Sequence, residues 1–160
     1  MRQCEARTLT LTSAGVADLM GAVLEKGGRF GFLARGTSMV PFLRDGDVLT
    51  IASLDNRQPR LGDVLAFSYP GEKGPNLVVH QIVGYKRPAI VLQGDGNGCT
   101  PEIISSESIL GRLVKVERDG RRVRLGLGPE RRLIAWLSRT RLLWTVVWPV
   151  WHRVREFLNR

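Results

Sequence analysis

The 160-residue sequence has only two cysteines and two histidines. The cysteines, Cys4 and Cys99, are too few for a disulfide framework or for a cysteine-rich zinc site. No metal-ligand spacing surrounds the histidines, His80 and His152. We therefore expect neither a metal site nor a cofactor.

Long apolar runs are also missing. The first 15 residues carry Arg2, Glu5 and Arg7 and have no apolar core, so they do not resemble a signal peptide. No stretch reaches the roughly 18 uncharged apolar residues that a membrane-spanning helix needs. We therefore expect a protein on the cytoplasmic side of the membrane, attached to it at most peripherally.

The overall composition is that of a globular protein. Hydrophobic residues make up 43% of the chain and charged residues 24%, which excludes a disordered or fibrous class. The net charge of +9 makes nucleic acid or an anionic membrane a natural partner. Which of the two applies depends on where the charge lies.

Hydrophobic periodicity predicts one helix followed by short strands. Residues 14–26 place Val16, Leu19, Met20, Val23 and Leu24 on one helix face, before two glycines end the helix. Short strands at this spacing favour a mainly β fold, a coiled sheet or partly open barrel. The predicted strands are 29–35, 47–54, 63–69, 77–85, 89–93, 109–117 and 121–127, with a turn or short helical segment at 36–46, loops at 70–76 and 94–101 and a tight turn at Asp119-Gly120.

The composition changes near the C-terminus. From Glu130 onward the chain is rich in Arg, Leu and Trp, and its pattern is helical, with a break at Pro149. All four tryptophans lie between residues 136 and 151. We therefore divide the chain into a β domain, 1–128, and a helical tail, 129–160.

The tail has the features of a membrane-surface segment. Residues 130–160 hold seven arginines and two glutamates, a net charge of +5. The apolar run 142–151 is too short to span a bilayer, but tryptophan beside arginine suits the membrane interface. The alternative is packing against the sheet or a second subunit. Nucleic acid is disfavoured as a partner because the arginines are interleaved with an apolar block. We expect His152 to lie at a surface edge of the tail.

Three segments carry side chains suited to catalysis. Ser38 lies in a turn, and a serine becomes a nucleophile when a base takes its proton. His80 interrupts an apolar strand, and imidazole is matched to proton transfer near neutral pH. Asp95 lies between glycines after a strand, and a carboxylate can orient a histidine. Taken singly, these are also an ordinary turn serine, a core histidine and a turn aspartate.

The order of these segments resembles that of signal peptidases. The matching boxes cover about residues 31–116, a little over half of the chain. They are Gly36-Thr37-Ser38-Met39-Val40-Pro41, Asp45-Gly46-Asp47-Val48, Gly62-Asp63-Val64-Leu65-Ala66-Phe67, Val78-Val79-His80-Gln81-Ile82-Val83 and Gly94-Asp95-Gly96-Asn97. The wider clan includes the LexA and UmuD self-cleaving proteins.

The resemblance implies a catalytic set. A histidine at the base position is similar to the endoplasmic-reticulum and archaeal signal peptidases, which implies Ser38 as nucleophile and His80 as general base. Asp95 matches the acid of the Gly-Asp-x-Asn box. The further acidic pair of the His-type enzymes is absent, and Glu102 is the nearest substitute. The third catalytic residue is therefore Asp95 or Glu102, with Asp95 ranked first.

The resemblance also implies how substrate is held. The residues around the nucleophile, Gly36, Thr37, Met39 and Pro41, are expected to contact the substrate. Many signal peptidases have a serine where this chain has Gly36, so the backbone N–H of Ser38, joined by the Thr37 hydroxyl, would hold the oxyanion. The peptide would bind extended beside an exposed strand and be cut after small residues.

The sequence thus predicts a serine endopeptidase acting on a peptide or protein substrate. The alternative is a catalytically silent peptide- or membrane-binding module on the same fold. A self-cleaving LexA-like regulator is disfavoured, because the 30 residues before the core hold one clear helix, too few for a helix-turn-helix. The oligomeric state is not predicted.

Overall fold

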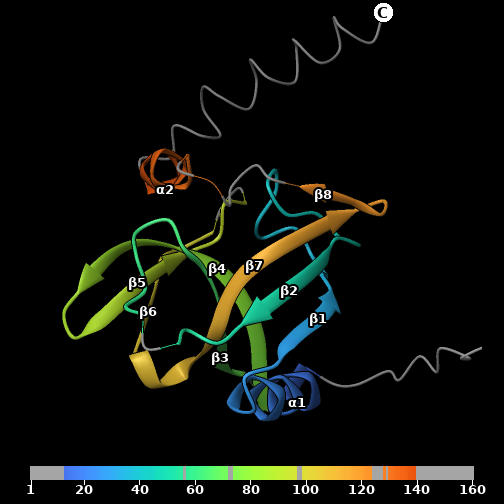
Figure 1. The fold of residues 1–160 in the computed structure, drawn as a ribbon. Helices are drawn as coiled ribbons and strands as arrows, with labels where there is room; N and C mark the ends of the chain where they lie inside the picture. Colours follow the sequence, from blue (N-terminus) through green and yellow to red (C-terminus); the bar gives the residue numbers. More distant parts are fainter. Residues whose placement is uncertain are drawn as a thin grey trace, which may run out of the picture.

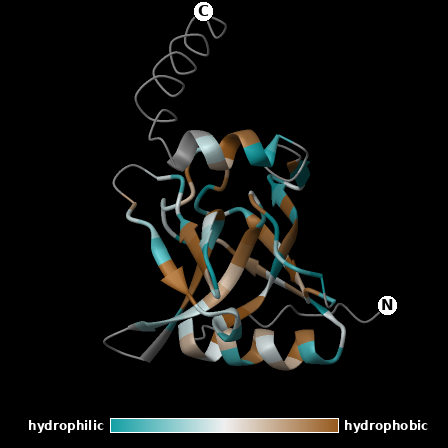
Figure 2. Ribbon diagram, turned by 90° about the vertical axis from the view of Figure 1, so that its left-hand side faces the viewer, coloured by the Kyte–Doolittle hydropathy of each residue, from teal (hydrophilic) through white to brown (hydrophobic). Residues whose placement is uncertain are grey.

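The computed structural model describes residues 13–55, 57–71, 74–96, 99–123, 128 and 130–139. In this part of the chain one antiparallel sheet of eight strands is accompanied by helix α1 (Ser13–Glu25) and helix α2 (Arg131–Arg139). The two helices lie at opposite ends of the sheet (Figure 1 and Figure 2). The predicted mainly β fold with an N-terminal helix and a C-terminal helical segment is confirmed.

The sheet is open. Its strand order is β1-β2-β7-β3-β4-β5-β6, with β8 paired to β7. Register shifts in the β2–β7, β3–β7 and β4–β5 ladders indicate bulges, which increase the local twist. The strands are β1 (Arg29–Leu33), β2 (Val48–Ala52), β3 (Val64–Gly71), β4 (Gly74–Lys86), β5 (Ala89–Gln93), β6 (Glu102–Ile104), β7 (Ile109–Arg118) and β8 (Arg121–Val123), and a 3₁₀ helix (Ser106–Ser108) precedes β7.

The first half of strand β3, from Val64 to Phe67, is buried on both faces. Val64 and Ala66 point into a core cluster with Met20 and Leu24 of α1, whereas Leu65 and Phe67 belong to a second cluster with β4, β5 and β6. Successive side chains of a strand point to opposite faces, so β3 separates the two halves of the core. This explains why the sequence from Val64 to Phe67 is continuously apolar rather than alternating.

The structure corrects the predicted helix face and one loop. Leu19 is 46% exposed, and Ala17 takes the buried position, because the face that meets the sheet runs through Ala17, Met20 and Leu24. The predicted loop 70–76 is largely strand, since β3 and β4 pair as far as Gly71 and Gly74. Beyond Phe67, β3 pairs with β4 alone, so a proline there breaks no second ladder.

The segment that carries Ser38 is fastened to the sheet through Asp47. This carboxylate is 1% exposed, and Arg118 of β7 holds it with two hydrogen bonds, Nε to Oδ1 at 2.8 Å and an Nη2 contact to Oδ2 at 2.7 Å. The same Nη2 donates to the Phe42 carbonyl at 3.1 Å. Although burial alone would raise the pKa of Asp47, the hydrogen bonds from Arg118 and the Arg44 backbone lower it.

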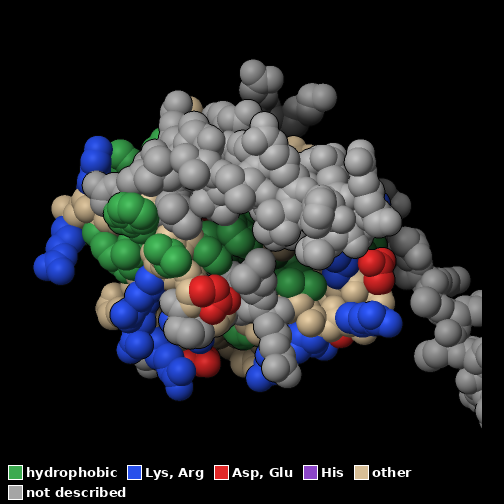
Figure 3. Space-filling model, turned by 90° about the horizontal axis from the view of Figure 1, so that it is seen from above, with side chains coloured by type: hydrophobic (Ala, Val, Ile, Leu, Met, Phe, Trp, Pro, Cys, Tyr) green, Lys and Arg blue, Asp and Glu red, His purple; other side chains and the backbone are tan. Residues whose placement is uncertain are grey.

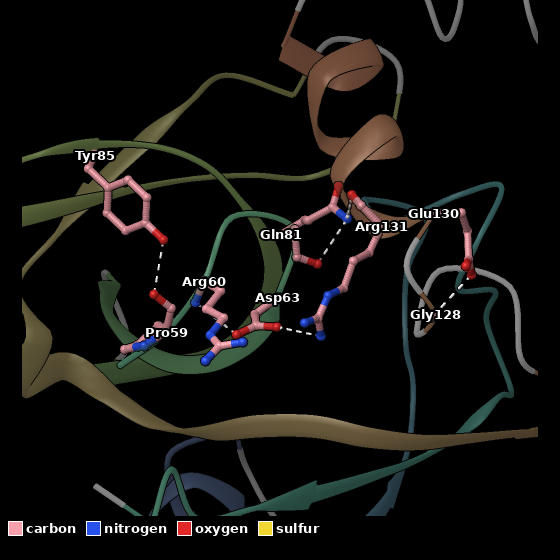
Figure 4. Close-up of polar contacts among 9 residues, drawn as sticks. Pro59, Arg60, Asp63, Gln81, Tyr85, Gly128, Glu130 and Arg131 are labelled. Carbon is pink, nitrogen blue, oxygen red and sulfur yellow. Dashed lines mark hydrogen bonds and ion pairs between the residues drawn. The ribbon is translucent and has the colours of Figure 1, made fainter. Parts of the chain in front are cut away.

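A second buried carboxylate, Asp63, fastens α2. Arg131 Nη1 lies 2.7 Å from Asp63 Oδ1, and Gln81 Nε2 donates to the Arg131 carbonyl at 3.3 Å (Figure 4). A Cβ on Gly62 would stand 2.7 Å from the same carbonyl, so helix and turn meet backbone to backbone. The first residues of the predicted tail are therefore packed on the sheet. The predicted tail residues 140–160 lie outside the described residues.

Candidate active site

Ser38 lies in a compact turn between β1 and β2, as the sequence predicts. Val40 N donates to the Thr37 carbonyl at 3.2 Å, and Leu43 N donates to the Met39 carbonyl at 2.9 Å. Met39 is 5% exposed and anchors the turn in the core, whereas Ser38 itself is exposed. The turn is therefore anchored in the core and exposes Ser38 to solvent.

A glycine loop after β5 packs against this turn. Gly96 N donates to the Ser38 carbonyl at 2.6 Å. A Cβ on Gly94 would overlap that carbonyl oxygen and stand 3.0 Å from His80 Nε2, and a Cβ on Gly96 would stand 2.7 Å from the Thr37 carbonyl. Only glycine permits such close approach. The predicted Gly-Asp-Gly box thus has a structural role, because it holds the serine turn beside the imidazole.

His80 is a buried residue of β4, 7% exposed. Its Nδ1 donates to Glu102 Oε2 at 3.0 Å, and its ring lies 6.0 Å from the Phe67 ring, centroid to centroid. Because a carboxylate only accepts hydrogen bonds, Nδ1 carries the proton in the neutral ring. Nε2, on the side of Gly94 and Ser38, then has the lone pair that a general base needs.

Burial keeps His80 neutral. It lowers the pKa of His80 below the ordinary value of 6.5, and the nearby Glu102 carboxylate raises it by less. The imidazole is therefore in its basic form at neutral pH. A general base has to be unprotonated before it can accept a proton.

The carboxylate on His80 is Glu102, although the sequence ranked Asp95 first. Glu102 opens β6, where it is paired with Leu92 of β5, while Gln93 of β5 is paired with Gln81 of β4. Two strand registers thus bring Glu102 beside His80. Asp95 is 2% exposed in the loop after β5. The sequence does not predict β6, because a strand of three residues is too short to show a hydrophobic period, and this strand positions Glu102.

Ser38, His80 and Glu102 line one cleft of about 680 Å³. Among the four residues predicted to contact substrate, Gly36 and Met39 line the cleft, whereas Thr37 and Pro41 do not. The hydrogen bonds of the described residues include none between Ser38 Oγ and His80 Nε2. The other residues that line the cleft come from α1, from β1 and the segment after it, from β2 and from β4. They are Ser13, Val16, Phe32, Leu33, Ala34, Arg35, Leu43, Arg44, Leu49 and residues 77–79.

Cys99 is a further neighbour of the serine turn that the sequence did not indicate. Its Sγ lies 3.6 Å from the Ser38 carbonyl oxygen, and burial raises the pKa of its thiol. The thiol is therefore in its protonated, weakly nucleophilic form. Within the described residues, no group of three or more His, Cys, Asp or Glu side chains is arranged to hold a metal ion.

Comparisons of the chain with protein-family models, with curated proteins and with solved structures gave no match. No helix in the described part of the chain is long and apolar enough to cross a membrane. The function therefore has to be inferred from the residues that line the cleft.

Proposed function

We propose that this protein is a serine endopeptidase in which Ser38 is the nucleophile, His80 the general base and Glu102 the residue that orients His80. The main support is the arrangement of the imidazole, with Nδ1 held by Glu102 at 3.0 Å and Nε2 beside the serine turn. A nucleophile, a base within reach and a third group orienting the base form the combination that activates a serine. The signal peptidase-like order of motifs supports the roles of Ser38 and His80.

The reaction is acyl transfer. Ser38 Oγ attacks the carbonyl carbon of the scissile peptide bond, and its proton passes to His80 Nε2. The imidazolium then protonates the leaving amine as the carbon–nitrogen bond breaks. Water attacks the resulting ester and gives a proton to the same Nε2, which returns it to Ser38 Oγ. Glu102 stabilises the imidazolium in both halves.

Substrate is proposed to enter along β1. This strand lies at an edge of the sheet, and its Phe32 and Leu33 line the cleft that contains Ser38. An extended peptide added to this edge gains main-chain hydrogen bonds. The oxyanion would be held by the Ser38 N–H with help from the Thr37 hydroxyl, and the signal peptidase resemblance implies small residues before the cut.

One observation favours the alternative of a silent binding module. Within the described residues, Ser38 Oγ and His80 Nε2 are not hydrogen-bonded. In empty sites catalytic hydrogen bonds are often long and tighten when substrate binds. Peptide binding without cleavage would identify the silent module.

Cleavage of a peptide library by the full chain and three variants tests the proposal. Ser38→Ala and His80→Ala should each abolish cleavage, measured by mass spectrometry of the products. Ser106→Ala is the control, because Ser106 is exposed on the 3₁₀ helix before β7, outside the cleft. The proposal fails if the wild type cuts nothing or if Ser38→Ala cuts as fast as the control.

A further inference from the structure

Helix α2 exposes large apolar side chains on its outer face. Leu133 is 59% exposed and Trp136 is 54% exposed, and their spacing of three residues places them on the same side of the helix. Ile134 and Ala135 are 6% and 1% exposed, and α2 packs against β4 of the sheet. Two faces of one short helix are therefore apolar: the inner one is buried, and the outer one carries two side chains that are each more than half exposed.

The outer face is held in a fixed position. Arg131 joins α2 to Asp63 through its side chain and to Gln81 through its carbonyl (Figure 4). Gln81 follows His80 on β4, and successive side chains of a strand point to opposite faces. Helix α2 therefore packs on the side of β4 opposite to the imidazole. A flat surface bound by α2 would leave the catalytic cleft free.

The charge around the exposed apolar face is positive. Arg132 is exposed next to Leu133, and residues 130–160 carry seven arginines against two glutamates. At the end of the molecule at which α2 lies, hydrophobic side chains have Lys and Arg side chains beside them, with some Asp and Glu side chains among these (Figure 3). Apolar groups and tryptophan beside cations match a bilayer interface with anionic headgroups.

Two other occupants fit less well. Nucleic acid binds to solvated cations on a polar face, whereas the arginines here border exposed apolar side chains. A second copy of this chain would bring another net charge of +9, so like charges would meet at the interface. Neither occupant would use both the apolar and the cationic features of α2.

From these observations we infer that the outer face of α2, formed by Arg132, Leu133 and Trp136, binds the surface of anionic phospholipid bilayers. Leu133 and Trp136 enter the interface, and Arg132 meets the lipid headgroups. The inference does not depend on the proposed peptidase activity, since binding requires neither Ser38 nor His80.

The tryptophans provide a built-in probe. All four lie at residues 136–151, so fluorescence excited selectively at tryptophan reports on this region alone. Titration with phosphatidylglycerol vesicles should shift the emission to shorter wavelength and sediment the protein with the vesicles. Phosphatidylcholine vesicles should do neither, and added salt should weaken binding because it screens the arginines.

A matched pair of variants tests the role of α2. Leu133→Glu should weaken binding to phosphatidylglycerol vesicles by at least about tenfold. The variant replaces an apolar side chain that would be buried in the interface by a charged one that would have to be dehydrated. Leu19→Glu makes the same change at an exposed leucine of α1, at the opposite end of the sheet, and should bind like the wild type. If Leu133→Glu does not fold, Arg132→Glu tests the same face.

Several results would overturn the inference. One is the absence of binding to phosphatidylglycerol vesicles at low salt, and another is equal binding by Leu133→Glu and Leu19→Glu. Tighter binding to an oligonucleotide than to vesicles would assign the face to nucleic acid. A dimer that sediments without lipid and is lost in Leu133→Glu would assign it to a second copy. Loss of peptide cleavage alone would count only against the proposed function.

Discussion

Two turns of this protein share one local design. Arg44–Val48 and Arg60–Val64 both follow the pattern Arg-x-Gly-Asp-Val, and each leads into a strand. The glycines have φ of 84° and 87°. In each turn an aspartate Oδ2 accepts the backbone N–H of the arginine three residues earlier at 2.8 Å. The same five-residue pattern thus buries an aspartate at the start of β2 and again at the start of β3.

The partners of the two aspartates differ. Asp47 is held by both ends of the Arg118 guanidinium, which also binds the Phe42 carbonyl in the Ser38 segment. Asp63 is paired with Arg131 of α2 through one ion pair. The first turn therefore supports the candidate active site, and the second attaches the proposed membrane-binding helix. The two proposed functions therefore depend on different ion pairs, so a substitution that breaks one of them should leave the other function intact.

Breaking the first support should have the largest effect. Arg118→Ala leaves the Asp47 carboxylate buried without its cation, which should cost about 3 kcal/mol or more of unfolding free energy. It also frees the Phe42 carbonyl, so peptide cleavage should fall. Urea denaturation and cleavage rates measure the two effects. Arg121→Ala, at an exposed residue of β8, is the control and should change the unfolding free energy by less than about 0.5 kcal/mol.

A substitution of Glu102 in the candidate active site should slow cleavage and leave membrane binding unchanged. Glu102→Gln should lower the rate of cleavage about a hundredfold, because the imidazolium loses its counter-charge. Glu102 raises the pKa of His80, so its removal should move the acidic limb of the pH–rate profile to lower pH. Asp95→Asn is the comparison: if it moves the limb and Glu102→Gln does not, Asp95 is the orienting acid.

Breaking the second support should have a smaller and more local effect. Arg131→Ala removes one ion pair from Asp63. The free energy needed to detach α2 from the sheet should therefore be about 1–3 kcal/mol lower than in the wild type. In urea, tryptophan fluorescence should then change before the circular dichroism of the sheet. Arg118→Ala should instead shift both signals together. Cleavage of a soluble peptide should be retained in Arg131→Ala, and its loss would show that the two supports are not separate.

The smallest effect is the pH dependence of stability that His80 causes. Burial lowers the pKa of His80 in the folded state below 6.5, so the unfolded chain binds the proton at higher pH. Stability from the neutral imidazole is therefore present above pH 6.5 and is lost as the pH falls through the folded-state pKa. The unfolding free energy should decrease from pH 7.5 to pH 5.5, and in His80→Gln it should decrease less. An equal decrease would assign the loss to other groups.

Residue patterns predicted those parts of the fold that are local in sequence. The helix, the strand β5, the Asp119-Gly120 turn and the turn at Ser38 follow from hydrophobic period and turn chemistry. The contacts that complete the site are not local. Arg118 lies 71 residues from Asp47, and Glu102 reaches His80 through a three-residue strand. Such pairings depend on sheet register, which no single segment encodes. The repeated Arg-x-Gly-Asp-Val pattern is present in the sequence, but its role depends on the arginines that pair with its aspartates, Arg118 and Arg131.

Covalent trapping tests the central proposal most directly. The full chain would be mixed with a peptide ester, quenched in acid and measured as an intact protein by mass spectrometry. We predict an acyl adduct located on Ser38, absent in Ser38→Ala and greatly reduced in His80→Ala. An equal adduct on Ser38→Ala, or no adduct on a wild type that binds the peptide, would contradict the serine peptidase assignment.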